Sequence, residues 1–299
     1  MKIIAYCLLI SLSLFSILGH AQLPPHRASI ICKNISINDF DSLDIQGPVN
    51  VYIDATQTHT SLQILGDPKR VLAVTYSEKN RILYLGTKPV YRSAPGERLT
   101  IRINTSPAQI KQIQFDSNAT LFGKGLSGSL TLRTQGAGQI NLYTNKLNLK
   151  SLYSIGNENI IFHNILSSNL NIEAHNSHNI VLQGIVSLNK INFTGNGNLQ
   201  VYWVNSPYLR IDAKGKGKID LAGIVKTVDI QLTQDIRLFA QHLRTQQGFV
   251  KTEKHVQANV NARNTLRAFA KDNSVIYYST PINFISKYSE GQGLVLNKN

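Results

Sequence analysis

The sequence has 299 residues, of which 42% are hydrophobic and 16% charged, with a formal net charge of +14 at pH 7. So much apolar sequence can bury a large core, which excludes an intrinsically disordered chain and a small disulfide scaffold. The 28 asparagines outnumber the 17 acidic residues. Asparagine is common in turns, whereas exposed helix faces are usually rich in charged residues, so this composition favours strands and turns.

The chain begins with features typical of a secretory signal peptide. Lys2 precedes an apolar run over residues 3–18, and Gly19-His20-Ala21 places small residues three and one before a cut after alanine. A membrane anchor would need about 20 apolar residues and stronger basic flanks. We therefore predict a signal peptide at 1–21, a tail at 22–35, and an exported protein that is periplasmic, attached to the outer envelope or secreted. No transmembrane segment is expected after cleavage.

Cleavage removes Cys7 and leaves Cys32 as the single thiol, so no intrachain disulfide can hold the exported protein together. The mature chain keeps 30 basic and 17 acidic residues, a formal charge of +13. Lipid attachment at Cys32 is disfavoured because Ile31 stands where a small residue is required. We expect Cys32 to be a half-buried residue near the first strand.

One domain is predicted over residues 36–299, and its first part, 36–112, is rich in strand patterns. Apolar and polar residues alternate over 40–53 around a Gly-Pro turn, which is typical of half-buried strands. Asp67-Pro68 predicts the start of a short helix that ends near Leu72. Further strands are predicted at 62–65, 81–85 and 99–103, and an irregular loop at 87–97.

The rest of the domain, 113–297, repeats itself. In six consecutive units a turn leads to an apolar anchor residue, and these anchors are spaced 19, 20, 20, 19 and 20 residues apart. A fixed period of this length predicts a solenoid. The spacing then drops to 17 before returning to 20, 19 and 19. The predicted anchors are Leu121, Ile140, Ile160, Ile180, Leu199, Ile219, Ile236, Val256, Val275 and Leu294.

Each unit contains two short stretches in which apolar and polar residues alternate, for example 130–133 and 140–143. This period of two indicates strands rather than helices. Strands of successive units then lie about 4.8 Å apart, and their anchors stack into an interior column. The predicted fold is all-β, a single-stranded β-solenoid of the parallel β-helix type with 19–20-residue coils and a β-rich N-terminal part. Leucine-rich repeats share this length, but their Leu-x-x-Leu-x-Leu pattern is missing.

Asn159, Asn179 and Asn198 each stand one residue before an anchor in consecutive units. Stacked amides can donate to one neighbour and accept from the other, so one hypothesis is an internal asparagine ladder. The alternative is three solvated turn asparagines.

Four short segments stand out along the chain: FDSLDIQGPVNV at 40–51, LTIRI at 99–103, VIYYSTP at 275–281 and GQGL at 291–294. Together they resemble the bacterial head GIN domain family, the head of autotransporter adhesins. The resemblance covers most of the mature chain. It implies an exported β-solenoid and points to adhesion, and it supplies no catalytic residues.

Parallel β-helices include polysaccharide lyases and hydrolases, so carboxylate pairs need consideration. Glu173 and Asp212 stand at the same strand position two units apart, which places their backbones about 9–10 Å from each other. That separation suits an inverting glycosidase. Two outward acids on a solenoid face are also expected by chance, so a carbohydrate-active enzyme is the alternative and not the main prediction.

His163, His175 and His178 form the densest histidine group. A zinc site needs three or four ligands, and no further ligand is evident, so we expect turn histidines that are exposed to solvent. No nucleophile-elbow or zinc-protease motif occurs in the sequence. Neither a cofactor nor a metal is predicted.

Basic and aromatic residues give the main candidate site. Three lysines alternate along one turn behind an arginine and can attract anions, and three aromatic residues one coil earlier can stack on a sugar ring. The other interpretation is a solvated turn that keeps the solenoid soluble. An exported chain meets anionic polysaccharides and cell-envelope glycans rather than nucleic acid. The candidate residues are Arg210, Lys214, Lys216, Lys218, Tyr202, Trp203 and Tyr208.

We therefore predict an exported, non-catalytic binding or adhesion module that presents a rigid, repetitive basic surface to anionic glycans through many weak contacts. The alternatives are a polysaccharide lyase or hydrolase on the same scaffold and a purely structural envelope protein. Salt-sensitive retention on an anionic polysaccharide, without release of product, distinguishes the module from the enzyme.

Overall fold

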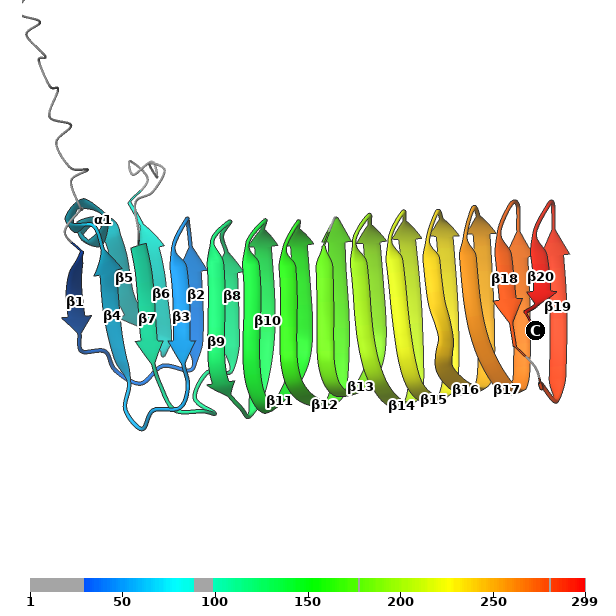
Figure 1. The fold of residues 1–299 in the computed structure, drawn as a ribbon, viewed down its shortest axis with the longest axis horizontal. Coiled ribbons are helices and arrows are strands. Elements are labelled where there is room, and N and C mark those ends of the chain that lie inside the picture. The colour runs from blue at the N-terminus through cyan, green and yellow to red at the C-terminus, as the bar shows by residue number, and fades with distance from the viewer. Residues whose placement is uncertain (1–29, 89–98, 177, 280, 299) are drawn as a thin grey trace, which may run out of the picture.

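The computed structural model describes residues 30–88, 99–176, 178–279 and 281–298. The predicted signal peptide and most of the predicted loop at 87–97 lie outside these residues. The described chain forms an elongated β-solenoid of about 10 turns with about 19 residues each, drawn as a row of laps in Figure 1. Strands make up 76% of it, and α1 (Pro68–Ala73) is the only helix in the described ranges. The predicted all-β solenoid is confirmed.

The central laps are long strands, each bent once and paired in parallel with the next. Every pairing has two blocks: between β12 and β13, Ile160 lies opposite Ile180 in the first block, and Ile172 lies opposite Ile191 in the second. Each lap therefore contributes to two sheets, which we call face A, from its first half, and face B, from its second. Two strands per repeat are confirmed. The central laps are β11 (Gln139–Gly156), β12 (Asn159–Asn176), β13 (Asn179–Gly195), β14 (Asn198–Gly215), β15 (Lys218–Gln234) and β16 (Arg237–Lys254).

Other strands continue the two faces on either side of the central laps. β9, β18 and β20 belong to face A, β8, β10 and β19 belong to face B, and β17 contributes to both. In β19, Lys287 lies opposite the buried Ala268, and its Nζ donates to the Tyr278 hydroxyl at 2.6 Å. A polar contact thus covers this end of the apolar core. The bounds are β8 (Gln112–Asp116), β9 (Thr120–Leu126), β10 (Ser129–Gly136), β17 (Gln257–Lys271), β18 (Val275–Tyr278), β19 (Phe284–Glu290) and β20 (Leu294–Asn297).

The N-terminal part continues the solenoid, but the chain passes through it in a different order. The lap of β2 and β3 lies between the lap of β8 and β9 and that of β6 and β7, all in parallel. Beyond them β4 pairs antiparallel with β7, β1 with β4, and β5 with β6. The bounds are β1 (Ile31–Ile35), β2 (Ser42–Gln46), β3 (Asn50–Asp54), β4 (Ser61–Gly66), β5 (Val74–Lys79), β6 (Ile82–Thr87) and β7 (Leu99–Asn104).

The strand segments and the short helix predicted for this part are all present, as β2 with β3, β4, β6, β7 and α1. Two strands have no counterpart in the sequence prediction. They are β5 and β1, and β1 lies within the segment 22–35 that the sequence suggests is a tail. Cys32 in β1 is exposed, so the prediction that it is half-buried is wrong. The reason is that β1 pairs only at the border of the sheet, outside the core.

The inward side chains of both faces form one continuous hydrophobic cluster from Ile37 to Tyr278. The six anchors from Leu121 to Ile219 all belong to it and are at most 1% exposed. Burying a Leu or Ile side chain contributes roughly 1.5–3 kcal/mol, so the stacked anchors stabilise the whole row of laps.

The later anchors of the predicted repeat are wrong in register. Ile219 pairs with Leu238 and not with Ile236. Ile236 stands two residues earlier, inside the turn, where it is fully buried. The two preceding laps have glycine at this position, so an apolar turn residue produced the apparent spacing of 17. The true equivalents in the last laps are Ala258, Ile276 and Val295 in place of Val256, Val275 and Leu294.

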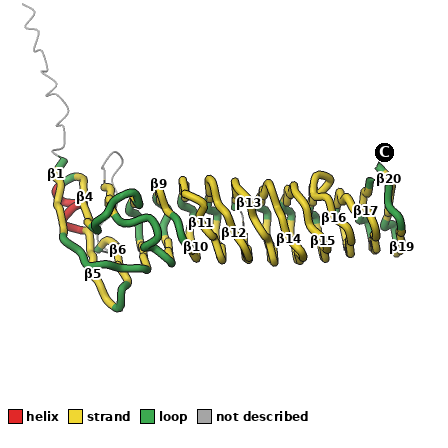
Figure 2. Tube along the Cα trace, turned by 90° about the horizontal axis from the view of Figure 1, so that it is seen from below, coloured by secondary structure: helices red, strands yellow, loops and turns green. Residues whose placement is uncertain are grey.

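Faces A and B meet at two edges of unequal width. At the narrow edge, along the top of Figure 1, two residues such as Asn157 and Glu158 connect one lap to the next. Gly156 precedes this turn with a φ of +140°, and a Cβ there would collide with the Gly136 carbonyl oxygen, so only glycine fits. At the wide edge, along the bottom of Figure 1 and toward the viewer in Figure 2, longer segments reverse the chain. The wide edge comprises residues 144–150, 164–170, 183–190, 202–209, 222–228, 241–248 and 261–266.

The hypothesis of an internal asparagine ladder is wrong, although two of the three asparagines do form one hydrogen-bonded rung. Asn179 Nδ2 donates to Asn159 Oδ1 at 2.8 Å across neighbouring laps. Both side chains are half-buried, whereas Asn198 in the next lap is exposed. The rung lies on the outer side of face A and is not internal, because the anchor one residue later takes the inward position.

Candidate functional site

Of the basic residues predicted as a site, Lys214, Lys216 and Lys218 lie at the narrow edge of β14 and β15, whereas Arg210 lies just past the wide-edge segment of β14, opposite Lys190. Two of these four residues are ion-paired. Arg210 donates to both oxygens of Asp212, at 2.8 and 3.2 Å, and this carboxylate raises the pKa of the guanidinium. Lys218 lies 3.7 Å from an oxygen of Asp220. The remaining two, Lys214 and Lys216, are exposed and have no acidic partner in the described chain. Half of the predicted positive charge is therefore already balanced.

The predicted aromatic residues lie at the opposite edge. Tyr202, Trp203 and Tyr208 belong to the same lap as Lys214, namely β14, but they stand in its wide-edge segment. Half a lap and the apolar core separate them from the lysines. The structure therefore divides the predicted site into a lysine group at the narrow edge and an aromatic group at the wide edge, with Arg210 next to the aromatic group.

The aromatic group borders a cavity of about 380 Å³ at the wide edge. Tyr202 and Trp203 form one side of it, and His242 and Arg244 approach from β16, two laps further on. Ala222 and Gly223 lie between them, and their small size leaves the space open. The sequence analysis missed the histidine and the arginine because they lie about 40 residues away along the chain.

Trp203 has a strained backbone. Its φ is +69° and its side chain is 71% exposed. Left-handed backbone costs a residue with a side chain about 1–2 kcal/mol, and a bulky residue there is an outlier. Gly184 and Gly223, each also four residues after the anchor of its lap, carry no such cost. Neither burial nor backbone geometry explains a tryptophan at this corner, so the ring is available for a ligand.

Charge along the wide edge has one sign. The seven wide-edge segments contain no Asp or Glu, and the six lysines and arginines among them are exposed and form no ion pair within the described chain. At about 4.8 Å per lap, the edge from β11 to β17 is about 29 Å long. In the sequence, the only sign of this surface is that one segment of each repeat contains no Asp or Glu. The six cations are Lys146, Lys150, Lys190, Lys226, Arg244 and Arg263.

The carboxylates considered for catalysis do share one column of face B. Glu173 lies opposite Asn192, which lies opposite Asp212, so the predicted two-lap separation is correct. Each carboxylate is already engaged, Glu173 with His175 at 3.0 Å and Asp212 with Arg210. Their side chains lie on the outer side of a sheet and not in the cavity of the wide edge.

The three histidines of the predicted group lie in different surroundings. The described residues contain no cluster of three or more His, Cys, Asp or Glu side chains placed to hold an ion. His163 stacks on Tyr143, with ring centroids 4.1 Å apart, and lies within hydrogen-bonding distance of Gln183 and Asn141. It therefore has a structural role in the outer layer of face A.

His178 contradicts the prediction of solvent-exposed turn histidines, because it is buried inside the narrow edge. Its Nδ1 lies 3.2 Å from Glu158 Oε2 and 3.1 Å from Ser154 Oγ, and that hydroxyl donates to the same carboxylate oxygen at 2.9 Å. Burial opposes ionisation of Glu158, but these contacts and its own backbone N–H outweigh it, so the pKa of Glu158 lies below its ordinary value. Both side chains are 0% exposed, so no substrate reaches this group.

Solved structures that match this chain share little sequence with it. A putative adhesin from Parabacteroides merdae is 17% identical, with 91% of this chain and 98% of that chain covered and a TM-score of 0.48. A putative lipid binding protein from Parabacteroides distasonis is 13% identical, with the same coverage and a TM-score of 0.46. No curated protein matches the chain.

The sequence itself gives the stronger comparison. It matches the family described as putative auto-transporter adhesin, head GIN domain, over residues 39–206 and again over 144–281. This description points to an exported, adhesion-type protein. In the described ranges no helix has the length and apolar character needed to cross a membrane. Because the two matches together span most of the sequence, the chain belongs to the head GIN domain family.

Proposed function

We propose that this adhesion-type protein binds anionic glycans along its wide edge. The observation that carries the proposal is the series of six exposed, unpaired cations on an edge without a single acidic residue. Such a surface attracts polyanions. Export brings it into contact with anionic polysaccharides and envelope glycans, and these, rather than nucleic acid, are the proposed partners.

Binding combines charge with stacking. Arg244 can meet a carboxylate or sulfate with two parallel N–H donors, and Tyr202 and Trp203, which border the same cavity, offer ring faces to a sugar. Cations on several laps then engage successive charged sugars of one chain. Each contact is weak, but their combination on a rigid rod gives avidity, and affinity falls as salt screens the charges.

Retention of the chain on immobilised heparin over a salt gradient tests the proposal. The triple variant Lys146→Glu, Lys226→Glu and Arg244→Glu reverses charge at the wide edge and is expected to elute at clearly lower salt. The matched control, Lys214→Glu, Lys216→Glu and Lys218→Glu, makes the same change of net charge at the narrow edge and is expected to behave nearly as the wild type. The opposite ranking, or equal shifts for both variants, refutes the wide edge as the contact surface.

The lysine group at the narrow edge is thus the competing site, with Lys214 and Lys216 as its unpaired members. No observation favours a purely structural protein. None favours an enzyme either, since the candidate carboxylates Glu173 and Asp212 are engaged with neighbouring side chains. Incubation with the retained polysaccharide is expected to release no reducing ends, and release that is lost in Glu173→Gln would establish the enzyme instead.

A further inference from the structure

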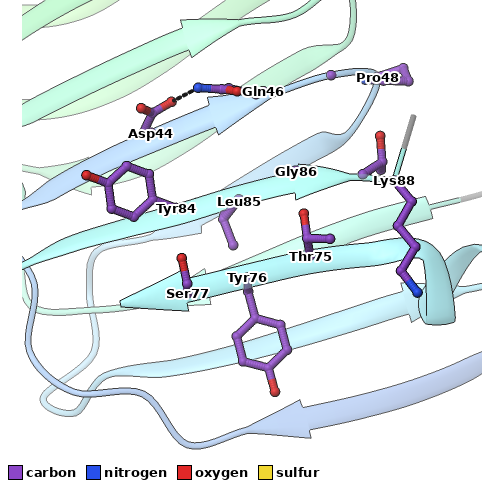
Figure 3. A pocket seen from close by; sticks show the side chains of 12 residues that line it. Asp44, Gln46, Pro48, Thr75, Tyr76, Ser77, Tyr84, Leu85, Gly86 and Lys88 are labelled. Atoms are coloured by element: carbon purple, nitrogen blue, oxygen red, sulfur yellow. Dashed lines mark hydrogen bonds between the residues drawn. The ribbon is translucent and has the colours of Figure 1, made fainter. Parts of the chain in front are cut away.

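A groove of about 590 Å³ lies over face B in the N-terminal part, far from the wide-edge cavity (Figure 3). It forms where β5 adds an antiparallel strand beside β6. The register places Asp44 opposite Tyr84 and Tyr84 opposite Ser77, with Gly86 opposite Thr75. Three neighbouring strands therefore present one set of outward side chains to the same space.

Glycine makes the groove hollow. Gly86 is the outward residue of β6 after Tyr84, and a Cβ there would stand 3.2 Å from Thr75 Oγ1 and 3.5 Å from the Gln46 carbonyl oxygen. A side chain at this position would fill the floor between β2 and β5. The half-buried Tyr84 stands beside this floor, and Figure 3 shows Thr75 and Ser77 on its side of β5 while Tyr76 points away.

The lining has no net charge and is rich in hydroxyls. The side-chain hydroxyls of four lining residues form no hydrogen bond with any other described residue. Asp44 accepts from Gln46 Nε2 at 3.3 Å, and its single negative charge is matched by Lys88 at the end of the groove. The groove therefore has no net charge with which to select an ion. The four residues with free hydroxyls are Thr75, Ser77, Tyr84 and Thr87.

We propose that this groove binds a neutral saccharide. Sugar hydroxyls both donate and accept hydrogen bonds, as do the free hydroxyls of the lining, and the apolar C–H face of a pyranose ring packs on an aromatic ring such as Tyr84. The carboxylate of Asp44 and the amide of Gln46 add an acceptor and a donor that fix the orientation of the sugar. This site does not depend on the wide edge, and its binding is insensitive to salt.

Affinity electrophoresis in gels that contain dextran, mannan, galactan or xylan tests the proposal. The chain is expected to be retarded by at least one of these uncharged polysaccharides, equally at low and moderate salt. Removing the ring in Tyr84→Ala or filling the floor in Gly86→Val is expected to weaken retardation about tenfold. The exposed double variant Thr75→Ala and Ser77→Ala, which leaves the core untouched, is expected to weaken it as well.

The control is Tyr153→Ala, which removes an aromatic ring from face B outside the groove, where Arg133 covers it at 4.2 Å from the ring centroid. It is expected to migrate as the wild type. The proposal is overturned if none of the four polysaccharides retards the chain, or if the groove variants migrate as the wild type does. It is also overturned if salt abolishes retardation and the wide-edge triple variant loses it, because the wide edge is then the site. The wide-edge proposal itself is judged on heparin alone, so either one can fail without the other.

Discussion

The narrow edge and the wide edge reverse the same chain at the two ends of every lap, but they constrain its sequence differently. At the narrow edge two residues complete the turn, and the second points into the core, so its size and polarity must suit the laps on either side. At the wide edge the longer segments carry many exposed positions whose side chains lie outside the core. The repeat therefore constrains side chains more closely at the narrow edge than at the exposed positions of the wide edge.

The inward column of the narrow edge shows how closely this edge is constrained. Glu158 and His178 fill it in two successive laps, and the laps on either side have Gly138 and Gly197 there. Further along, the same position is apolar, with Ile236 fully buried. The column thus accepts a hydrogen-bonded Glu–His pair or an aliphatic side chain, provided that each residue matches its neighbours.

The largest effect is expected when this buried pair is broken. In His178→Val the carboxylate of Glu158 stays buried without its partner, which is expected to lower the free energy of unfolding by about 3–5 kcal/mol. Chemical denaturation measures the loss. In the double variant Glu158→Val and His178→Val both polar side chains are gone, as in the later laps, so much of the stability is expected to return. A double variant less stable than the single one would show that the pair does not act as a unit.

The second prediction concerns acid. A carboxyl whose pKa is lower in the folded than in the unfolded state binds fewer protons when folded, so its contribution is present above its ordinary pKa of 4.5 and disappears as the pH falls through the lower folded value. Stability is therefore expected to decrease below about pH 4.5, and the Glu158→Gln variant to show a shallower decrease. Thermal melting from pH 7 to pH 3 measures both. Equal slopes would assign the acid sensitivity to other carboxylates, such as Asp54. Partial burial of Asp54 opposes its ionisation, but its contacts with Lys124 and Thr56 outweigh this and lower its pKa as well.

The third prediction separates stability from binding at the wide edge. Trp203→Gly relieves a left-handed residue, worth about 1–2 kcal/mol, and adds backbone entropy to the unfolded chain, worth about 0.5–1 kcal/mol in the other direction. The melting temperature is therefore expected to stay the same or rise slightly, while retention on heparin weakens. A clear drop in melting temperature would mean that Trp203 serves the fold and not a ligand.

The smallest effect is expected at the outward asparagine rung. Asn179→Leu removes its hydrogen bond to Asn159 at a half-buried position, which is expected to cost about 0.5–1 kcal/mol. Chemical denaturation again gives the value. The same substitution at the exposed Asn198 serves as the control and is expected to have no measurable effect. A loss above that of His178→Val would place the rung inside the core after all.

The repeat was predictable because every lap obeys the same packing requirement. Each lap must place an apolar side chain on the anchor below, so Leu121, Ile140 and their successors recur every 19 or 20 residues and reveal the coil before any coordinates. The error at Ile236 has the same origin. The sequence shows that a residue is apolar, but only the strand pairing shows whether it lies on a face or inside a turn.

Tertiary structure alone decided which residues share a surface. The lysines at 214–218 and the aromatic residues at 202–208 are close in sequence, yet they lie at opposite edges of the flattened coil. Arg244 and Trp203 border the same cavity because laps two repeats apart are close in space. The N-terminal groove is even harder to predict from the sequence. Its strands β2, β5 and β6 are neighbours only because β6 pairs with β2 on one side and with β5 on the other. Local side-chain periodicity determines that a coil forms, whereas the winding of the chain determines which side chains meet.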